Sequence, residues 1–172
     1  MAANDVLFET GTALTWKASA GDYVITLASL AAAAARQGAK GDLGAKRAVR
    51  WACRVQLNMD VAPVNGAAVE IYWSSSPSAT AGTDNTGGCS GADAAYTGSA
   101  GGLVAATKLQ LQLIGAMPMT ADADTVVQIA EFVWYPTQRY GMPVVVNGTA
   151  QVLEGDNDSH QIVVFPLNEE IA

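Results

Sequence analysis

A single histidine is the only side chain of this sequence whose unperturbed pKa lies near neutral pH. His160 follows Asp158 and Ser159 and precedes an apolar segment. A catalytic triad needs a nucleophile beside the imidazole, and the strand-turn-helix motif that presents such a serine is absent from the sequence. We therefore expect a solvated histidine at the edge of a strand and not a catalytic base.

Carboxylates could act as a general acid and base if two of them faced each other at ~5–9 Å. Glu70 and Glu131 are the only acids within segments that have the pattern of a strand. Nothing in the sequence pairs the two segments, so these acids could be cross-strand neighbours only by chance, and an enzyme is the weakest of the functional hypotheses. Two acidic turns, residues 122–124 and 156–158, offer oxygen ligands but lack the full calcium-loop pattern. We expect ordinary Asx turns there, and whether Asp122 and Asp124 or Asp156 and Asp158 bind an ion stays open.

The cysteines and the tryptophans are better explained by structural roles than by chemical ones. Cys53 lies on the apolar side of a strand pattern and Cys89 in a Gly- and Ser-rich stretch, so two free thiols are expected. Four aromatic residues could form a sugar-stacking platform: Trp51, Trp73, Trp134 and Tyr135. The alternation of apolar and polar residues around Trp51 and Trp73 instead favours packing of these two in the core. No cofactor is expected.

The elements that position these residues are strands. Residues 49–59 alternate apolar and mostly polar side chains, which predicts a strand with one buried and one wet face. Residues 67–73 alternate again after an Asn65-Gly66 turn, which predicts a hairpin with the first strand or two consecutive strands of one layer. Residues 108–113 and 125–135 are further strand candidates. A change of phase near Ala130 and Glu131 suggests a β-bulge, or a strand that is covered on both faces.

Shorter apolar runs complete the predicted architecture. They are residues 6–8, 13–17, 23–27, 144–146 and 162–165. Residues 29–38 have a serine cap, an alanine run and a glycine stop, which by propensity is a short helix, with an irregular or extended segment as the alternative. Many strands with turns between them predict an all-β fold, a jelly-roll-like antiparallel β-sandwich with at most one short helix.

Composition limits the possible partners. The 172 residues have a net charge of −7, which disfavours binding to free nucleic acid. Only 15% of the residues are charged, which suits a protein that packs against other protein as well as a small sandwich. The acidic start does not resemble a signal peptide, and the apolar run 27–35 is too short to span a bilayer. We expect synthesis in a cytoplasm and no membrane partner.

The organisation predicted is one domain over residues 1–172. Residues 74–102 form a long loop with seven glycines and a single large apolar residue, Tyr96. We expect a functional loop, or a covering loop held down by Tyr96. Residues 1–11 and 167–172 are possible docking extensions.

Several stretches, in this order and spacing, carry a family resemblance. They read ITLASL at 25–30, ARQG at 35–38, DLG at 42–44, VEIYWSSS at 69–76, QLIG at 112–115 and RYGMPVVVN at 139–147. From about residue 12 to residue 166 the chain resembles small virion proteins of tailed bacteriophages, in particular jelly-roll capsid decoration (cement) proteins. The alanine run at 31–35 departs from the family pattern.

The resemblance implies a non-enzymatic structural protein on the capsid surface of a virion, which binds the major capsid protein as a homotrimer. No catalytic residues are carried over. The residues that we expect to contact partners are Arg50, Arg54, Tyr96, Tyr140, Phe8 and Ile171. Two alternatives remain: a tail, baseplate or head-fibre component, and a carbohydrate- or receptor-binding module that exposes Tyr96, Tyr135 and Tyr140.

Overall fold

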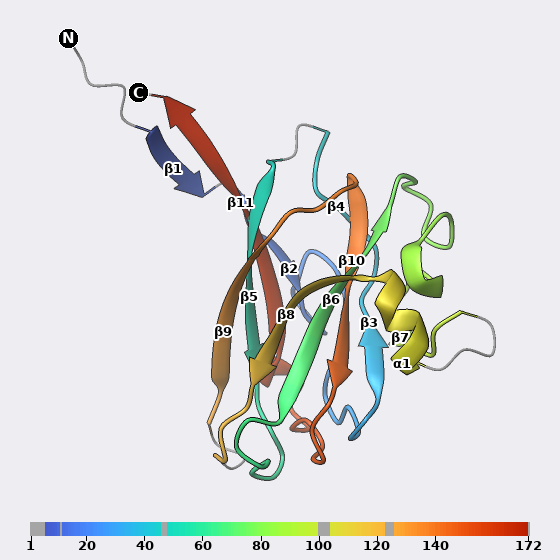
Figure 1. The fold of residues 1–172 in the computed structure, drawn as a ribbon, viewed down its shortest axis with the longest axis vertical. Helices are drawn as coiled ribbons and strands as arrows, with labels where there is room; N and C mark the ends of the chain where they lie inside the picture. The colour runs from blue at the N-terminus through green and yellow to red at the C-terminus, as the bar shows by residue number, and fades with distance from the viewer. Residues whose placement is uncertain (1–5, 11, 46–47, 100–103, 123–125, 172) are drawn as a thin grey trace.

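The computed structural model describes residues 6–10, 12–45, 48–99, 104–122 and 126–171 (Figure 1). Two antiparallel sheets pack face to face, so the predicted all-β sandwich is confirmed. The first sheet, sheet A, has the order β1-β11-β5-β9 with β2 also on β11, and the second, sheet B, has the order β7-β3-β10-β6-β8 with β4 also on β10. The chain crosses between the sheets at most connections, as in jelly rolls.

The strands of sheet A are β1 (Val6–Thr10), β2 (Leu14–Trp16), β5 (Arg50–Leu57), β9 (Gln128–Trp134) and β11 (Gln161–Ile171). Those of sheet B are β3 (Ala35–Gln37), β4 (Gly41–Asp42), β6 (Ala68–Ser76), β7 (Ala94–Ala95), β8 (Gln112–Pro118) and β10 (Tyr140–Asn147). The short helices are η1 (Thr86–Gly88), α1 (Val104–Thr107), η2 (Lys108–Gln110) and η3 (Asn157–Ser159).

The core between the sheets is built around a chain of indole rings. Trp16 meets Trp73 edge-on at 5.6 Å between ring centroids, and Trp73 and Trp134 are 5.5 Å apart. Trp134 lies 6.1 Å from Trp51, so the aromatic contacts run across both sheets. The four indoles are at most 3% exposed, which confirms the packing interpretation of Trp51 and Trp73 and leaves no indole on the surface for a sugar. Tyr135, the fourth member of the predicted platform, is 54% exposed.

The long alternating segment is a strand, as predicted. In β5 the side chains of Trp51, Cys53, Val55 and Leu57 are buried, and Arg54 on the opposite face is exposed. The predicted hairpin with residues 67–73 is wrong, because β5 pairs with β11 and β9 in sheet A, whereas β6 pairs with β10 and β8 in sheet B. The Asn65-Gly66 turn therefore joins the two layers.

Residues 29–38 are not a helix. The alanine run makes tight turns with Ser29 and Ala33 at positive φ, and then enters β3. Asn147 of β10 explains the shape, because its side-chain amide donates to the carbonyls of Leu30 and Ala31 at 3.1 and 3.2 Å. Its backbone also accepts from the Ala33 amide at 2.9 Å. These bonds outweigh a weak helix propensity that one leucine anchor cannot support.

Three other segments differ from the prediction. Residues 108–113 form η2 and only the beginning of β8. Residues 23–27 are not part of either sheet: they form an isolated bridge between Tyr23 and Trp16 and single backbone hydrogen bonds to neighbouring segments. The bulge predicted near Ala130 is absent from the register of β9 with β5, and the irregularity lies instead where β8 pairs with Ile71 and Tyr72 of β6.

Candidate interaction surface

The outer face of sheet A carries mixed apolar and charged rows across three strands. Phe165 of β11, Ala52 of β5 and Val133 of β9 are successive partners in one row. In the next row Arg54 lies between Val163 and Glu131, and its guanidinium is 3.2 Å from the Glu131 carboxylate. Both side chains of that ion pair are largely exposed, so the pair contributes little to stability.

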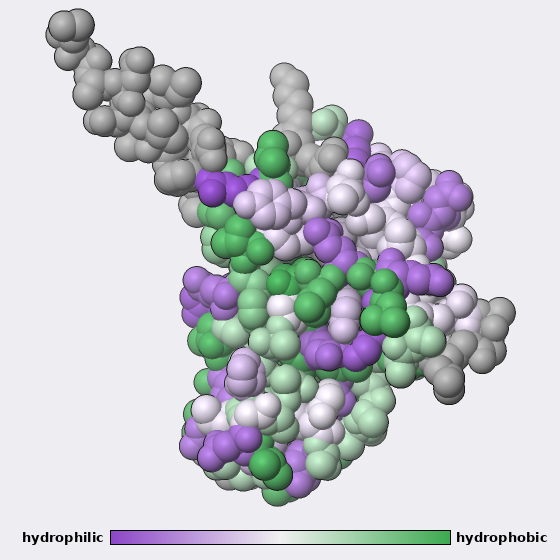
Figure 2. Space-filling view, in the orientation of Figure 1, coloured by the Kyte–Doolittle hydropathy of each residue, from purple (hydrophilic) through white to green (hydrophobic). Residues whose placement is uncertain are grey.

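Exposed apolar side chains gather on and around β9. Five of the twelve large apolar residues that are exposed in the described chain lie between positions 126 and 135. They are Val126, Val127, Ile129, Val133 and Tyr135. In Figure 2 apolar and hydrophilic side chains are interspersed along the edge of the body where β9 runs. An apolar surface rimmed by polar groups is typical of a site that binds protein.

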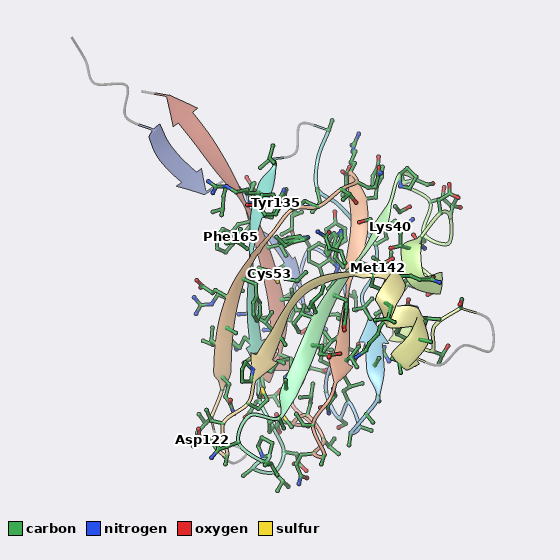
Figure 3. The ribbon with its side chains drawn as sticks, viewed as in Figure 1. Lys40, Cys53, Asp122, Tyr135, Met142 and Phe165 are labelled. Carbon is green, nitrogen blue, oxygen red and sulfur yellow. The ribbon has the colours of Figure 1, made fainter. Side chains whose placement is uncertain are left out.

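A two-stranded ribbon projects from one end of the sandwich. β1 pairs with the last part of β11, from Val6 opposite Ile171 to Thr10 opposite Leu167, and this ribbon leaves the body (Figure 1). The two predicted docking extensions are thus partners of each other. Phe8 lies opposite Glu169 in the register, and Ile171 opposite Val6. Figure 3 places Phe165 and Tyr135 near the end of the body from which the ribbon projects.

The remaining predicted contact residues are scattered over the molecule. Arg50 begins β5 opposite Leu167, at the root of the ribbon. Tyr140 begins β10 in the other sheet, with the Arg139 guanidinium 4.9 Å from its ring. Tyr96 is only 2% exposed and donates its hydroxyl to the Gly87 carbonyl at 2.7 Å, so the prediction of a surface contact at Tyr96 is wrong. The structure does not bring these residues into one site.

The long loop is held to sheet B by buried polar contacts. The Asp93 carboxylate accepts hydrogen bonds from Nε and Nη2 of Arg36, both at 2.8 Å, and from the Thr26 hydroxyl at 2.7 Å. These bonds keep the pKa of the Asp93 carboxyl below its usual range against the opposing effect of burial, which is the largest single influence on it. The side-chain amide of Gln37 donates to the Ser90 hydroxyl and accepts a hydrogen bond from the Ser90 backbone amide. The covering interpretation of the loop is therefore supported.

One lysine organises the exposed part of this loop. The Lys40 ammonium donates to the Ser76 hydroxyl at 2.9 Å and to the carbonyls of Ser78, Thr80 and Thr83 at 3.1, 2.7 and 3.0 Å. Burial lowers the pKa of Lys40, an effect that the charge of Asp84 opposes. No sequence pattern marked this lysine, because its acceptors are backbone carbonyls that any sequence provides.

The predicted chemical groups do not assemble into a reactive site. The prediction of a solvated His160 is wrong, because its side chain is only 2% exposed. The backbone amide of Asn58 donates to its Nδ1 at 3.3 Å, and its Nε2–H donates to the Glu154 carbonyl at 2.9 Å. Glu131 lies in sheet A and forms an ion pair with Arg54. Glu70 lies in sheet B, where Lys108 and Tyr72 bind it. The two carboxylates therefore do not form a pair.

The thiols and the acidic turn at residues 156–158 also have structural roles. Burial raises the pKa of Cys53 to about 12 and that of Cys89 to about 11, and both remain free thiols. Asp156 accepts the Asp158 amide at 2.9 Å, which is the expected Asx turn. Asp124 lies outside the described residues. No group of three or more metal-ligating side chains occurs within the part of the chain that the structure describes.

A shallow pocket of about 210 Å³ lies beside α1, with the Glu70–Lys108 pair on its wall. Its other lining atoms are mainly apolar and come from Ala33, Val104, Ala105 and Val146.

Within the described ranges, no helix is long and apolar enough to cross a membrane. No protein family model matches this chain, and no curated protein is significantly similar to it.

Proposed function

We propose that this chain is a non-enzymatic structural protein of a bacteriophage virion, which decorates and stabilises the capsid by binding the major capsid protein as a homotrimer. The observation that carries the proposal is the combination of a packed sandwich with a projecting ribbon and, on the same sheet, an outer face on which exposed apolar side chains lie among charged ones. A protein that clamps neighbouring subunits needs surfaces of this kind and no reactive centre. The sequence resemblance to decoration proteins points in the same direction.

The carbohydrate-binding alternative is disfavoured by the tyrosines. It needs at least two aromatic rings exposed on one surface. Tyr96 is buried, and Tyr140 is partly covered beneath Arg139 in the other sheet, which leaves Tyr135 alone among the three candidates.

Cosedimentation with capsids tests the proposal. Purified protein is mixed with mature particles of the phage that encodes it, prepared without this gene, and the particles are pelleted. We expect saturable binding at a fixed ratio to the major capsid protein, with avidity from several sites engaged at once. Absence of the protein from the pellet at saturating concentration would contradict the proposal. Binding only to isolated tails would favour the tail alternative.

A further inference from the structure

The projecting ribbon is an incomplete sheet. β11 pairs with β5 only as far as Leu167 opposite Arg50, and beyond that point, among the described residues, β11 pairs with β1 alone. A ribbon of two strands is marginally stable in water, and independent stability needs a third strand or a packed surface. The ribbon therefore has the structure of an element that is completed by another chain.

The opposite edge of the same sheet is also open. β9 has seven residues and, among the described residues, pairs only with β5. Proteins protect edge strands with charged side chains, prolines or bulges. β9 has no lysine, proline or bulge, and its one charged residue, Glu131, is paired with Arg54 of the neighbouring strand. The edge strand of the other sheet, β8, in contrast has a register irregularity and a terminal Pro118. Since β9 also exposes Ile129 and Val133, it is an unprotected edge with an apolar surface.

We infer that the ribbon of one copy adds its β1 strand to the β9 edge of a second copy. This inference rests on the homotrimer of the proposed function and names the contact that would form it. The chain's own ribbon cannot make this contact, because β11 and β5 separate β1 from β9 in the sheet order. Each copy offers one ribbon and one open edge, so the contact is head-to-tail and can close into a ring.

Charge selects β1 as the strand that pairs. The other free edge of the ribbon belongs to β11, whose sequence there includes Glu169 and Glu170, and β9 carries Glu131. Like charges opposed across strands are destabilising. β1 reads VLFET and has a single acid, Glu9, so it brings fewer like charges to the β9 edge than β11 would.

A charge placed on the edge tests the contact in solution. Light scattering with size-exclusion chromatography is expected to give an oligomer for the full chain, and Val133→Lys is expected to lower the mass to the 17.7 kDa of one chain. Val133 is 54% exposed, so the folded monomer should tolerate the lysine. Val64→Lys is the matched control, because Val64 is exposed at the turn between the layers and is expected to leave the mass unchanged.

Cross-linking establishes which surfaces meet. Phe8→Cys and Val133→Cys are made in separate chains, and a short bis-maleimide is added to each alone and to their mixture. The native thiols are buried and unreactive, so a covalent dimer is expected only in the mixture. A monomeric full chain, or cross-linking of Phe8→Cys with itself, would overturn the inference. A monomer that still sediments with capsids would overturn this contact but not capsid binding.

Discussion

The buried imidazole of His160 joins two loops at one end of the sandwich. Its Nδ1 accepts a hydrogen bond from the backbone amide of Asn58, so the ring proton must lie on Nε2, which donates to the Glu154 carbonyl. Burial lowers the pKa of His160 from its ordinary value of 6.5, opposed by the bond to Glu154 and by the charges of Glu154 and Asp156. The folded state thus favours neutral imidazole, because protonation would remove the acceptor of the Asn58 amide.

This arrangement predicts acid sensitivity. Because the folded pKa is below the unfolded pKa, the unfolded state binds more protons between the two values, and stability increases with pH there. The stabilisation is fully present above pH 6.5 and is lost as the pH falls toward the lower folded value. Urea unfolding from pH ~7.5 to ~5 should show this loss for the natural chain and a flatter profile for His160→Gln. Identical profiles for the two proteins would refute it.

A second residue-scale prediction concerns Lys40. Lys40→Met removes the donor shared by one hydroxyl and three carbonyls, so we expect a loss of about 1–3 kcal/mol in unfolding free energy. Hydrogen exchange should also become faster in the loop after β6, while the indole core stays protected. Lys17→Met is the matched control, because Lys17 pairs with Asp158, whose side chain is 71% exposed, and should cost less. Equal losses for the two variants would contradict the role of Lys40.

At the scale of elements, the sheets approach closely where β8 passes β9. A Cβ on Gly115 would lie 2.2 Å from a ring carbon of Phe132, so only glycine fits this position. We expect Gly115→Ala to lower the unfolding free energy by about 1–3 kcal/mol through overpacking. In Gly82→Ala the new Cβ would meet its nearest atom at 3.8 Å, and its stability should stay close to that of the natural chain. Thermal unfolding compares the two, and a neutral Gly115→Ala would contradict this packing.

Local patterns predicted the strands in which apolar and polar residues alternate along the sequence. The alternation around Trp51 and around Ile71 identifies β5 and β6 with their buried faces, because one residue of slip would expose every indole and aliphatic side chain. The turn between them indicates a reversal but not which sheet receives the next strand. The alanine run was mispredicted because its partner, Asn147, lies more than 110 positions away in the sequence.

The candidate surface could be predicted only in part. The strand β9 was predicted, but the exposed Val127 and Ile129 imitate a buried face of opposite parity to Phe132 and Trp134, and this produced the false bulge. Arg54 was identified as a face residue, whereas its ion pair with Glu131 depends on strand order, which a single sequence does not contain. The ribbon pairs the two ends of the chain, and no local signal encodes that register.

At the scale of the whole molecule, a well-packed body carries two open edges of one sheet. The loop of sheet B is tied down by Arg36, Gln37 and Lys40, so sheet B presents a covered surface. Sheet A instead presents the ribbon at one edge and β9 at the other. A symmetric particle could use such a molecule many times, since small contacts repeated over many copies add up to strong attachment.

The most direct test of the proposed function is the number of copies of this protein per virion. Purified particles of the encoding phage are analysed by quantitative mass spectrometry, and this chain is counted relative to the major capsid protein. Capsid decoration predicts hundreds of copies, in a fixed ratio set by the symmetry of the shell. Tens of copies or fewer would place the protein in the tail or a fibre, and its absence from purified particles would contradict a virion role altogether.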